Sequence, residues 1–303
     1  MVSWIDWRRF ALVRMEVAAM PVWVVKTLAV GPGVVVSVVV VALTLAAAPG
    51  PIAAGAALVL AGVVAAAGHR AWEGPAAAIV LGARRLRPSE RHDLAAVLTQ
   101  LCRAGLGPPL VDVRVKRSRA IGAMGSGRRT IIVSTGLIEA VVRGDLPSHQ
   151  AAAVVAHSAV LVREGATRAD LLIGCASAPW RATRAAIHGI CGSLHRLPLT
   201  QASWRLRVVV VAVAVVQAVQ AGRVDLAVAI AAIGTLSYGL PVWERRWHQL
   251  LVRVGDEGVA RVGFGDDLVA FLHTCPRTDD TRTRLRTLLP SGTRRPALGI
   301  VTH

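Results

Sequence analysis

His157 carries the most informative chemistry in the chain, since it lies within an Ala- and Val-rich segment, residues 151–161. A helical histidine binds zinc in an H-E-x-x-H pattern, where histidines at i and i+4 share one face and the Glu activates a zinc-bound water. Ser158 stands at the Glu position here, and Leu161 stands at the second His position. Serine cannot act as that base and leucine cannot bind metal. The segment therefore keeps one ligand and loses the catalytic base.

Glu244 and His248 form a second polar pair, because i and i+4 positions share one helix face. With His157 they would make a substitute set of two histidines and one carboxylate for zinc. Glu164 follows His157 on the same side, but two helical turns, about 10 Å, is far for a base acting on the same water. The alternative is structural: His157 packs in a core, and Glu244 pairs with a neighbouring arginine, Arg245 or Arg246.

The elements that position these residues are predicted from hydrophobicity. With 54% hydrophobic residues, the 303-residue chain is more apolar than an ordinary soluble domain. Four uncharged or nearly uncharged runs have a length suited to about 30 Å of hydrocarbon. They pair into two helical hairpins with turns at Pro49-Gly50-Pro51 and Gly222-Arg223, and the four predicted transmembrane helices cover residues 28–48, 51–68, 206–221 and 224–243.

The basic residues predict the orientation of these spans. Arginines are dense before the first hairpin, between the hairpins and after the second, so the positive-inside rule places both termini and the central segment in the cytoplasm. Five tryptophans lie at the cytoplasmic ends of the spans: Trp23, Trp72, Trp204, Trp243 and Trp247. We expect a protein of the cytoplasmic (inner) membrane without a cleaved signal peptide. Residues 1–27, with Trp4, Trp7 and Phe10, are predicted to form an amphipathic interfacial segment.

The cytoplasmic domain is predicted in two parts, residues 69–205 and 244–303. Pro88 opens a helix with Leu94, Val97, Leu98 and Leu101 on one face. Residues 111–115 and 130–133 are β-prone, so we expect a small β-hairpin across the Gly-rich link 123–129. Helices are then expected at 136–142 and, capped by Asp145 or Ser148, through His157. The fold class is mainly α, with little sheet.

The net charge of +17 does not indicate a nucleic-acid-binding protein. Of the 35 basic residues 33 are arginines, spread over every cytoplasmic segment, and no helix-turn-helix or zinc finger accompanies them. Charge beside membrane spans favours contact with anionic lipid. The cysteines, Cys102, Cys175, Cys191 and Cys275, form no C-x-x-C pair and are expected to be reduced.

The order of these elements resembles the HtpX-like membrane zinc metallopeptidases over residues 28–288. Residues 120–125 are similar to the family's substrate-edge segment and keep Ala123 and Gly125. Residues 131–138 match the following strand and helix, and residues 154–157 match the approach to the zinc helix. Glu244 and His248 stand at the family's E-x-x-x-D site, with His in place of Asp, and Thr274-Cys275-Pro276 resembles the family's Thr-His-Pro.

The resemblance implies a peptidase scaffold whose departures fall on the catalytic positions. We therefore expect a pseudopeptidase that needs no cofactor and binds or regulates membrane proteins or a partner protease. Two alternatives remain open at this point: an active zinc metalloendopeptidase that uses His157, Glu244 and His248, and an integral membrane protein unrelated to proteolysis. The lack of ionisable residues in the first two spans argues against a transport path.

Overall fold

The computed structural model describes residues 22–69, 72–108, 110–194 and 198–289. Most described residues are helical, and four short strands form one sheet. The predicted interfacial residues Trp4, Trp7 and Phe10 lie outside the described residues, as do the side chains of Cys191 and Trp204.

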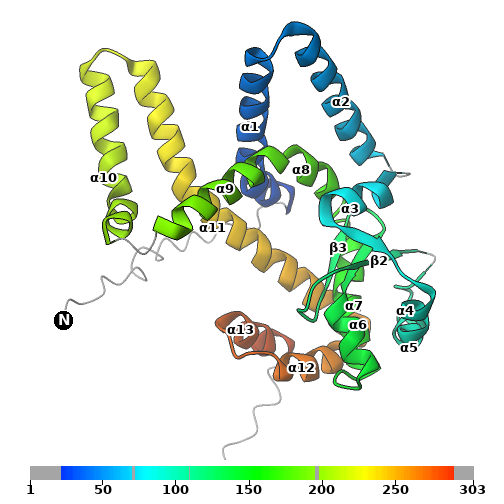
Figure 1. Cartoon of the computed structure of the whole chain (residues 1–303). Coiled ribbons are helices and arrows are strands. Elements are labelled where there is room, and N and C mark those ends of the chain that lie inside the picture. The colour runs from blue at the N-terminus through cyan, green and yellow to red at the C-terminus, as the bar shows by residue number, and fades with distance from the viewer. Residues whose placement is uncertain (1–21, 70–71, 109, 195–197, 290–303) are drawn as a thin grey trace, which may run out of the picture.

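Two apolar hairpins extend from the sheet domain in the same direction (Figure 1). The first joins α1 (Val22–Ala47) to α2 (Gly50–Gly68) through Pro49, and the second joins α10 (Pro198–Gln220) to α11 (Val224–Arg261) through Gly222. Gly222 has φ 71°, a left-handed conformation that suits glycine at this turn. All four helices lie where the sequence predicted spans, but α11 continues well past residue 243.

Length and hydropathy divide these four helices into two classes. Trp23–Ala47 and Val224–Arg261 are long and apolar enough to cross a membrane, whereas the apolar parts of α2 and α10, Gly50–Ala66 and Val208–Gln220, are shorter than the usual span. This weakly indicates association with a membrane. The prediction of four spans stays a prediction.

The sheet has four strands in the order β1-β2-β4-β3. β1 (Ala83–Arg85) is antiparallel to β2 (Asp112–Lys116), β2 is parallel to β4 (Thr130–Ser134), and β3 (Ala123–Ser126) is antiparallel to β4. The predicted β-hairpin between 111–115 and 130–133 is therefore wrong, because the segment between these strands contributes β3. A tight turn at Gly127, with φ 68°, returns β3 onto β4, so β2 meets β4 from the other side in parallel.

Gly125 lies inside β3 because α7 (Ser148–Arg163) passes directly over the strand. A Cβ at this position would lie 2.9 Å from Val162 Cγ2 and 3.0 Å from the Ser158 carbonyl oxygen. Gly125, part of the predicted Gly-rich link 123–129, is thus required by the packing of α7 on β3.

The core lies between the sheet, α5 (Ala95–Arg103) and α7. Leu94, Val97 and Leu101 are buried, as the predicted apolar face requires, although the helix is divided at Leu94 into α4 (Pro88–Asp93) and α5. α7 is buried around nearly its whole circumference, which explains its Ala and Val content. α6 (Thr135–Val142) follows the N-cap Ser134 and begins one residue before the predicted start at 136. The remaining helices are α3 (Glu73–Leu81), α8 (Asp170–Ala176), α9 (Ala178–Leu194), α12 (Gly265–Thr274) and α13 (Asp279–Leu288).

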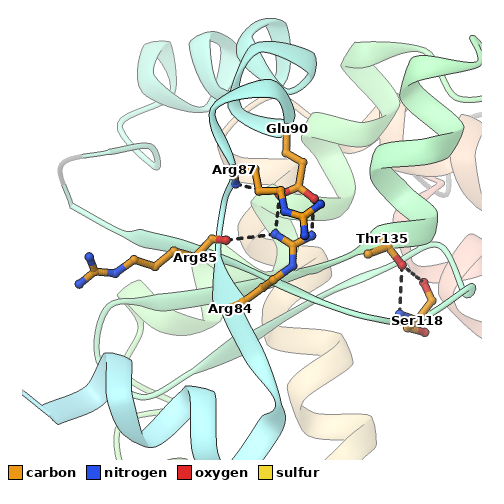
Figure 2. Close-up of polar contacts among 6 residues, drawn as sticks. All are labelled: Arg84, Arg85, Arg87, Glu90, Ser118 and Thr135. Atoms are coloured by element: carbon orange, nitrogen blue, oxygen red, sulfur yellow. Dashed lines mark hydrogen bonds and ion pairs between the residues drawn. The ribbon is translucent and has the colours of Figure 1, made fainter.

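Polar contacts fix the two connections that flank the sheet (Figure 2). Arg84 of β1 donates two hydrogen bonds to the Glu90 carboxylate of α4, which also accepts from the Arg87 backbone N–H at 2.9 Å. The hydrogen bonds from Arg84 hold the pKa of Glu90 at about 2. Thr135 Oγ1 donates to the Ser118 carbonyl at 2.9 Å and accepts from the Ser118 N–H at 3.1 Å, which pins the segment leading to β3.

Candidate functional site

The candidate site is a cleft of about 500 Å³ at the start of β3. Its walls come from the segment leading into β3, from α7 and α11, and from the two C-terminal helices α12 and α13. The volume lies within the range typical of ligand sites. Apolar side chains such as Ile121, Val154 and Phe271 alternate with polar ones, so the lining is mixed.

Three side chains from three helices meet at the floor of this cleft. His157 of α7 brings Nδ1 to 3.0 Å from Oδ1 of Asp256 on α11. Arg284 of α13 binds the same carboxylate through both oxygens, with Nε to Oδ2 at 2.9 Å and Nη2 to Oδ1 at 2.6 Å. The orientation of the imidazole is poor for a hydrogen bond, and the buried Nδ1 has no hydrogen-bond partner among the described residues. The guanidinium is therefore the principal partner of Asp256.

Two glycines of α11 allow the close approach of α7. A Cβ at Gly255 would overlap the imidazole ring of His157, and a Cβ at Gly258 would overlap the side chain of Val160. His157 and Val160 are one turn apart on α7, as Gly255 and Gly258 are on α11. The two helices thus cross at a contact that any larger side chain would push apart.

Asp256 is buried, with 3% of its surface exposed. Burial raises the pKa of its carboxyl group, but the contacts with His157 and Arg284 outweigh this effect and hold the pKa below its ordinary value. Asp256 is therefore ionised at neutral pH, and the Arg284 guanidinium supplies the compensating positive charge.

The structure brings together only some of the residues selected from the sequence. His157 and His248 both line the cleft. Glu244 is not part of the cleft lining, and its carboxylate instead pairs with Arg184 of α9 at 3.1 Å. Glu164 lies 3.6 Å from Arg261 in another ion pair.

The remaining predicted residues lie on α7 and β3. Ser158, at the general-base position, is 1% exposed and faces away from solvent. Leu161 belongs to the buried residues of α7. Ala123 lines the cleft, and Gly125 lies farther along β3 beneath α7. β3 is the last strand in the order of the sheet, so Ala123 and Gly125 lie on an edge strand.

Asp256 and Arg284 are the site residues that sequence reasoning missed. The E-x-x-x-polar pattern drew attention to Glu244, twelve positions before Asp256 on the same helix. The signal available was the pair Gly255 and Gly258, which flanks an aspartate within a helix and indicates a close helix crossing. An arginine-rich helix after Pro276 was the corresponding signal for Arg284.

The residues around His157 do not suit a zinc ion. Within the described parts of the chain no three His, Cys, Asp or Glu side chains gather as metal ligands. Asp256 is the carboxylate nearest His157 in the cleft, and Arg284 already binds both of its oxygens. A bound guanidinium competes directly with a metal for those oxygens.

Comparisons with family models, with curated proteins and with solved structures find no match to this chain. The geometry of the cleft must therefore support any functional proposal.

Proposed function

We propose that this protein is a membrane-anchored pseudopeptidase that binds an extended segment of another protein without cleaving it. One observation carries the proposal. Next to His157, where a peptidase would hold a metal, the cleft holds an aspartate neutralised by an arginine. The cleft offers a lined groove and a sheet edge, Ser158 stands at the general-base position, and the described residues contain no group of three His, Cys, Asp or Glu side chains suited to a metal.

The resemblance to HtpX-like peptidases becomes more consistent with this geometry after a shift of eight positions along α11. We assign the family's E-x-x-x-D site to Val252 and Asp256 instead of Glu244 and His248. Val252 and Asp256 are one turn apart, and both line the cleft that contains His157. On this assignment the third ligand position is an aliphatic residue, and two of the three zinc ligands of the family are missing.

The sheet edge supplies the means of binding. β3 pairs with β4 on one side only, and its first residues border the cleft. An extended peptide can add to such an edge through main-chain hydrogen bonds, while the cleft receives its side chains. The Ser118–Thr135 contacts and the hydrogen bond from the Gly122 N–H to Ser134 Oγ at 3.1 Å keep this edge in place.

We further propose that four helices cross the inner membrane and that the cleft faces the cytoplasm. Large apolar side chains are exposed on all four hairpin helices, including Val38, Leu58, Val210 and Ile233. Lys26 lies 5.4 Å from the ring of Trp247, and Arg246 lies 5.1 Å from that of Trp243. Arg246 beside Trp243 suits a membrane interface with anionic lipid, whereas Lys26 is already paired with Asp170 at 2.8 Å.

The orientation can be tested with Cys102, which is exposed. In a variant with Cys102 as the single cysteine, a membrane-impermeant maleimide should leave intact cells unlabelled and label the protein once the membrane is opened. Labelling of intact cells would reverse the orientation.

Peptide binding can be tested with the full chain in lipid nanodiscs and a pool of ten-residue fluorescent peptides of random sequence. Fluorescence anisotropy should detect bound members, and mass spectrometry should find them uncleaved with or without added zinc. Val252→Trp, which fills the cleft, should weaken binding at least about 10-fold. Val142→Trp, on the exposed face of α6, is the matched control. Absence of binding, or chelator-sensitive cleavage, would contradict the proposal.

A further inference from the structure

One wall of the cleft carries a cation that the fold does not use. His248, Gln249 and Arg253 project from α11 into the cleft, and Arg253 is exposed. Neither His248 nor Arg253 has an ion-pair or hydrogen-bond partner among the described residues. Arg284, by contrast, is held by Asp256. Arg253 is thus the arginine of this lining that is still available to a ligand.

The carboxylates of the cleft do not neutralise Arg253. Asp256 is bound by Arg284 and lies close to His157. Asp280, in the first turn of α13, lines the same cleft but forms no ion pair with Arg253 in the described part of the chain. The α11 wall is therefore basic through Arg253, and Asp280 of α13 belongs to the same lining.

Ile121 and Ala123 border the same cleft as this basic wall. A segment that pairs with the β3 edge would have its side chains alternate between the two sides of the strand. One group on the occupant can then reach Arg253 while the main chain is held by β3. A guanidinium binds a carboxylate most strongly, through two parallel hydrogen bonds.

We propose that the cleft selects extended segments bearing a carboxylate, which Arg253 binds, with His248 in the same lining. The carboxylate can come from an acidic side chain or from a chain terminus, since both offer the same two oxygens. This inference rests on the proposed peptide-binding function and names the class of ligand.

The test uses three ten-residue peptides of alternating Val, Ser and Thr, each with an uncharged fluorophore at the N-terminus. The first ends in an amide and has no acid, the second ends in a free carboxylate, and the third ends in an amide with one central Asp. Binding to the full chain in uncharged-lipid nanodiscs is measured by anisotropy. At least one carboxylate peptide should bind about 10-fold more tightly than the acid-free amide, and the identity of that peptide distinguishes a terminus from a side chain.

Variants assign the preference to α11. Arg253→Gln should abolish the preference for carboxylate, whereas Arg253→Lys should keep part of it. Arg277→Gln, which removes an exposed arginine outside the cleft, should leave the preference unchanged. Equal binding of all three peptides to the unaltered chain, or a preference that survives in Arg253→Gln, would overturn this inference and leave the proposed function standing. Failure of every peptide in the set and in the random pool would instead overturn the proposed function.

Discussion

The chain contains two ion pairs of the same chemistry in different surroundings. Arg84 and Glu90 join β1 to α4 near the surface, and Arg284 and Asp256 join α13 to α11 at the floor of the cleft. Both arginines bind both carboxylate oxygens. The side chains of Arg84 and Glu90 are 41% and 14% exposed, whereas those of Arg284 and Asp256 are 23% and 4% exposed.

This difference in burial decides what each pair does. Water can replace either partner of the surface pair, so its loss costs little. The second pair is largely shielded from water, and removing one partner leaves a poorly solvated charge without compensation. The pair at the cleft floor therefore contributes to the stability of the fold, whereas the surface pair only connects β1 to α4 locally.

Asp256→Ala should produce the largest loss of stability. Arg284 and the Nδ1 of His157 would lose their anion, and we expect a decrease of about 3–5 kcal/mol in the free energy of unfolding. Chemical unfolding of the full chain in detergent would measure it. The double variant Asp256→Leu/Arg284→Met should recover most of the loss, because it leaves no buried charge. A double variant as unstable as Asp256→Ala would mean that the pair is not the cause.

Gly255→Ala should destabilise by about 1–3 kcal/mol, because its Cβ would overlap the His157 ring. An alanine in a helix normally stabilises by about 1 kcal/mol relative to glycine. Gly239→Ala in the same helix is the control, since its Cβ would meet Trp243 only at 3.8 Å. In a His157→Ala background the Gly255→Ala penalty should disappear. A persistent penalty would show that the ring is not what limits the approach of α7.

Glu90→Gln should cost about 1 kcal/mol or less at neutral pH. The hydrogen bonds from Arg84 lower the folded pKa of Glu90 to about 2, so the contribution is fully present above the unfolded pKa, about 4.3. It is lost as the pH falls from there through about 2. Unfolding midpoints of both proteins should therefore converge between pH 4.5 and pH 2. If the difference in unfolding midpoint between the two proteins stayed constant from pH 4.5 to pH 2, the ionised pair could not be the cause of that difference.

The smallest effect is expected for the coupling between His157 and Glu244. Their partners are different, Asp256 and Arg184, so the stability losses of His157→Ala and Glu244→Ala should add within about 0.5 kcal/mol. A double-mutant cycle by thermal unfolding measures this. Coupling above 1 kcal/mol would connect two regions that the contacts separate.

Sequence periodicity predicted the local elements well where one helix face or a proline decided them. Pro88, Ser134 and the Pro49 turn lie at element boundaries because their backbone and capping preferences act within a few residues. The relative direction of β2 and β4 was predicted wrongly, because the chain between them forms β3 and β4 therefore runs parallel to β2. Gly125 in β3 is required by packing against α7, a contact that local sequence does not reveal.

The site residues likewise divide into those that local sequence indicates and those that depend on tertiary contacts. His157 could be selected because its own segment is unusual. Asp256 was missed, because its role depends on a helix crossing and on Arg284, 28 positions later, and the glycines beside it were the only signal in its own segment. The resemblance to the family's E-x-x-x-D site favoured Glu244, which is a carboxylate on α11 but lies outside the cleft and pairs with Arg184. Local chemistry can be read from spacing, but the partner of a buried charge is decided by tertiary packing.

α11 also connects the two halves of the molecule mechanically. It is one helix of 38 residues, about 57 Å long, that begins at the tip of the second hairpin and contributes Asp256 to the cleft floor. A stiff rod of this length converts a small change of tilt at one end into a displacement of a few ångströms at the other. If α11 crosses the membrane as proposed, a straight helix would pass a change of tilt in the bilayer on to the width of the cleft, whereas a bend at Pro241 would absorb it.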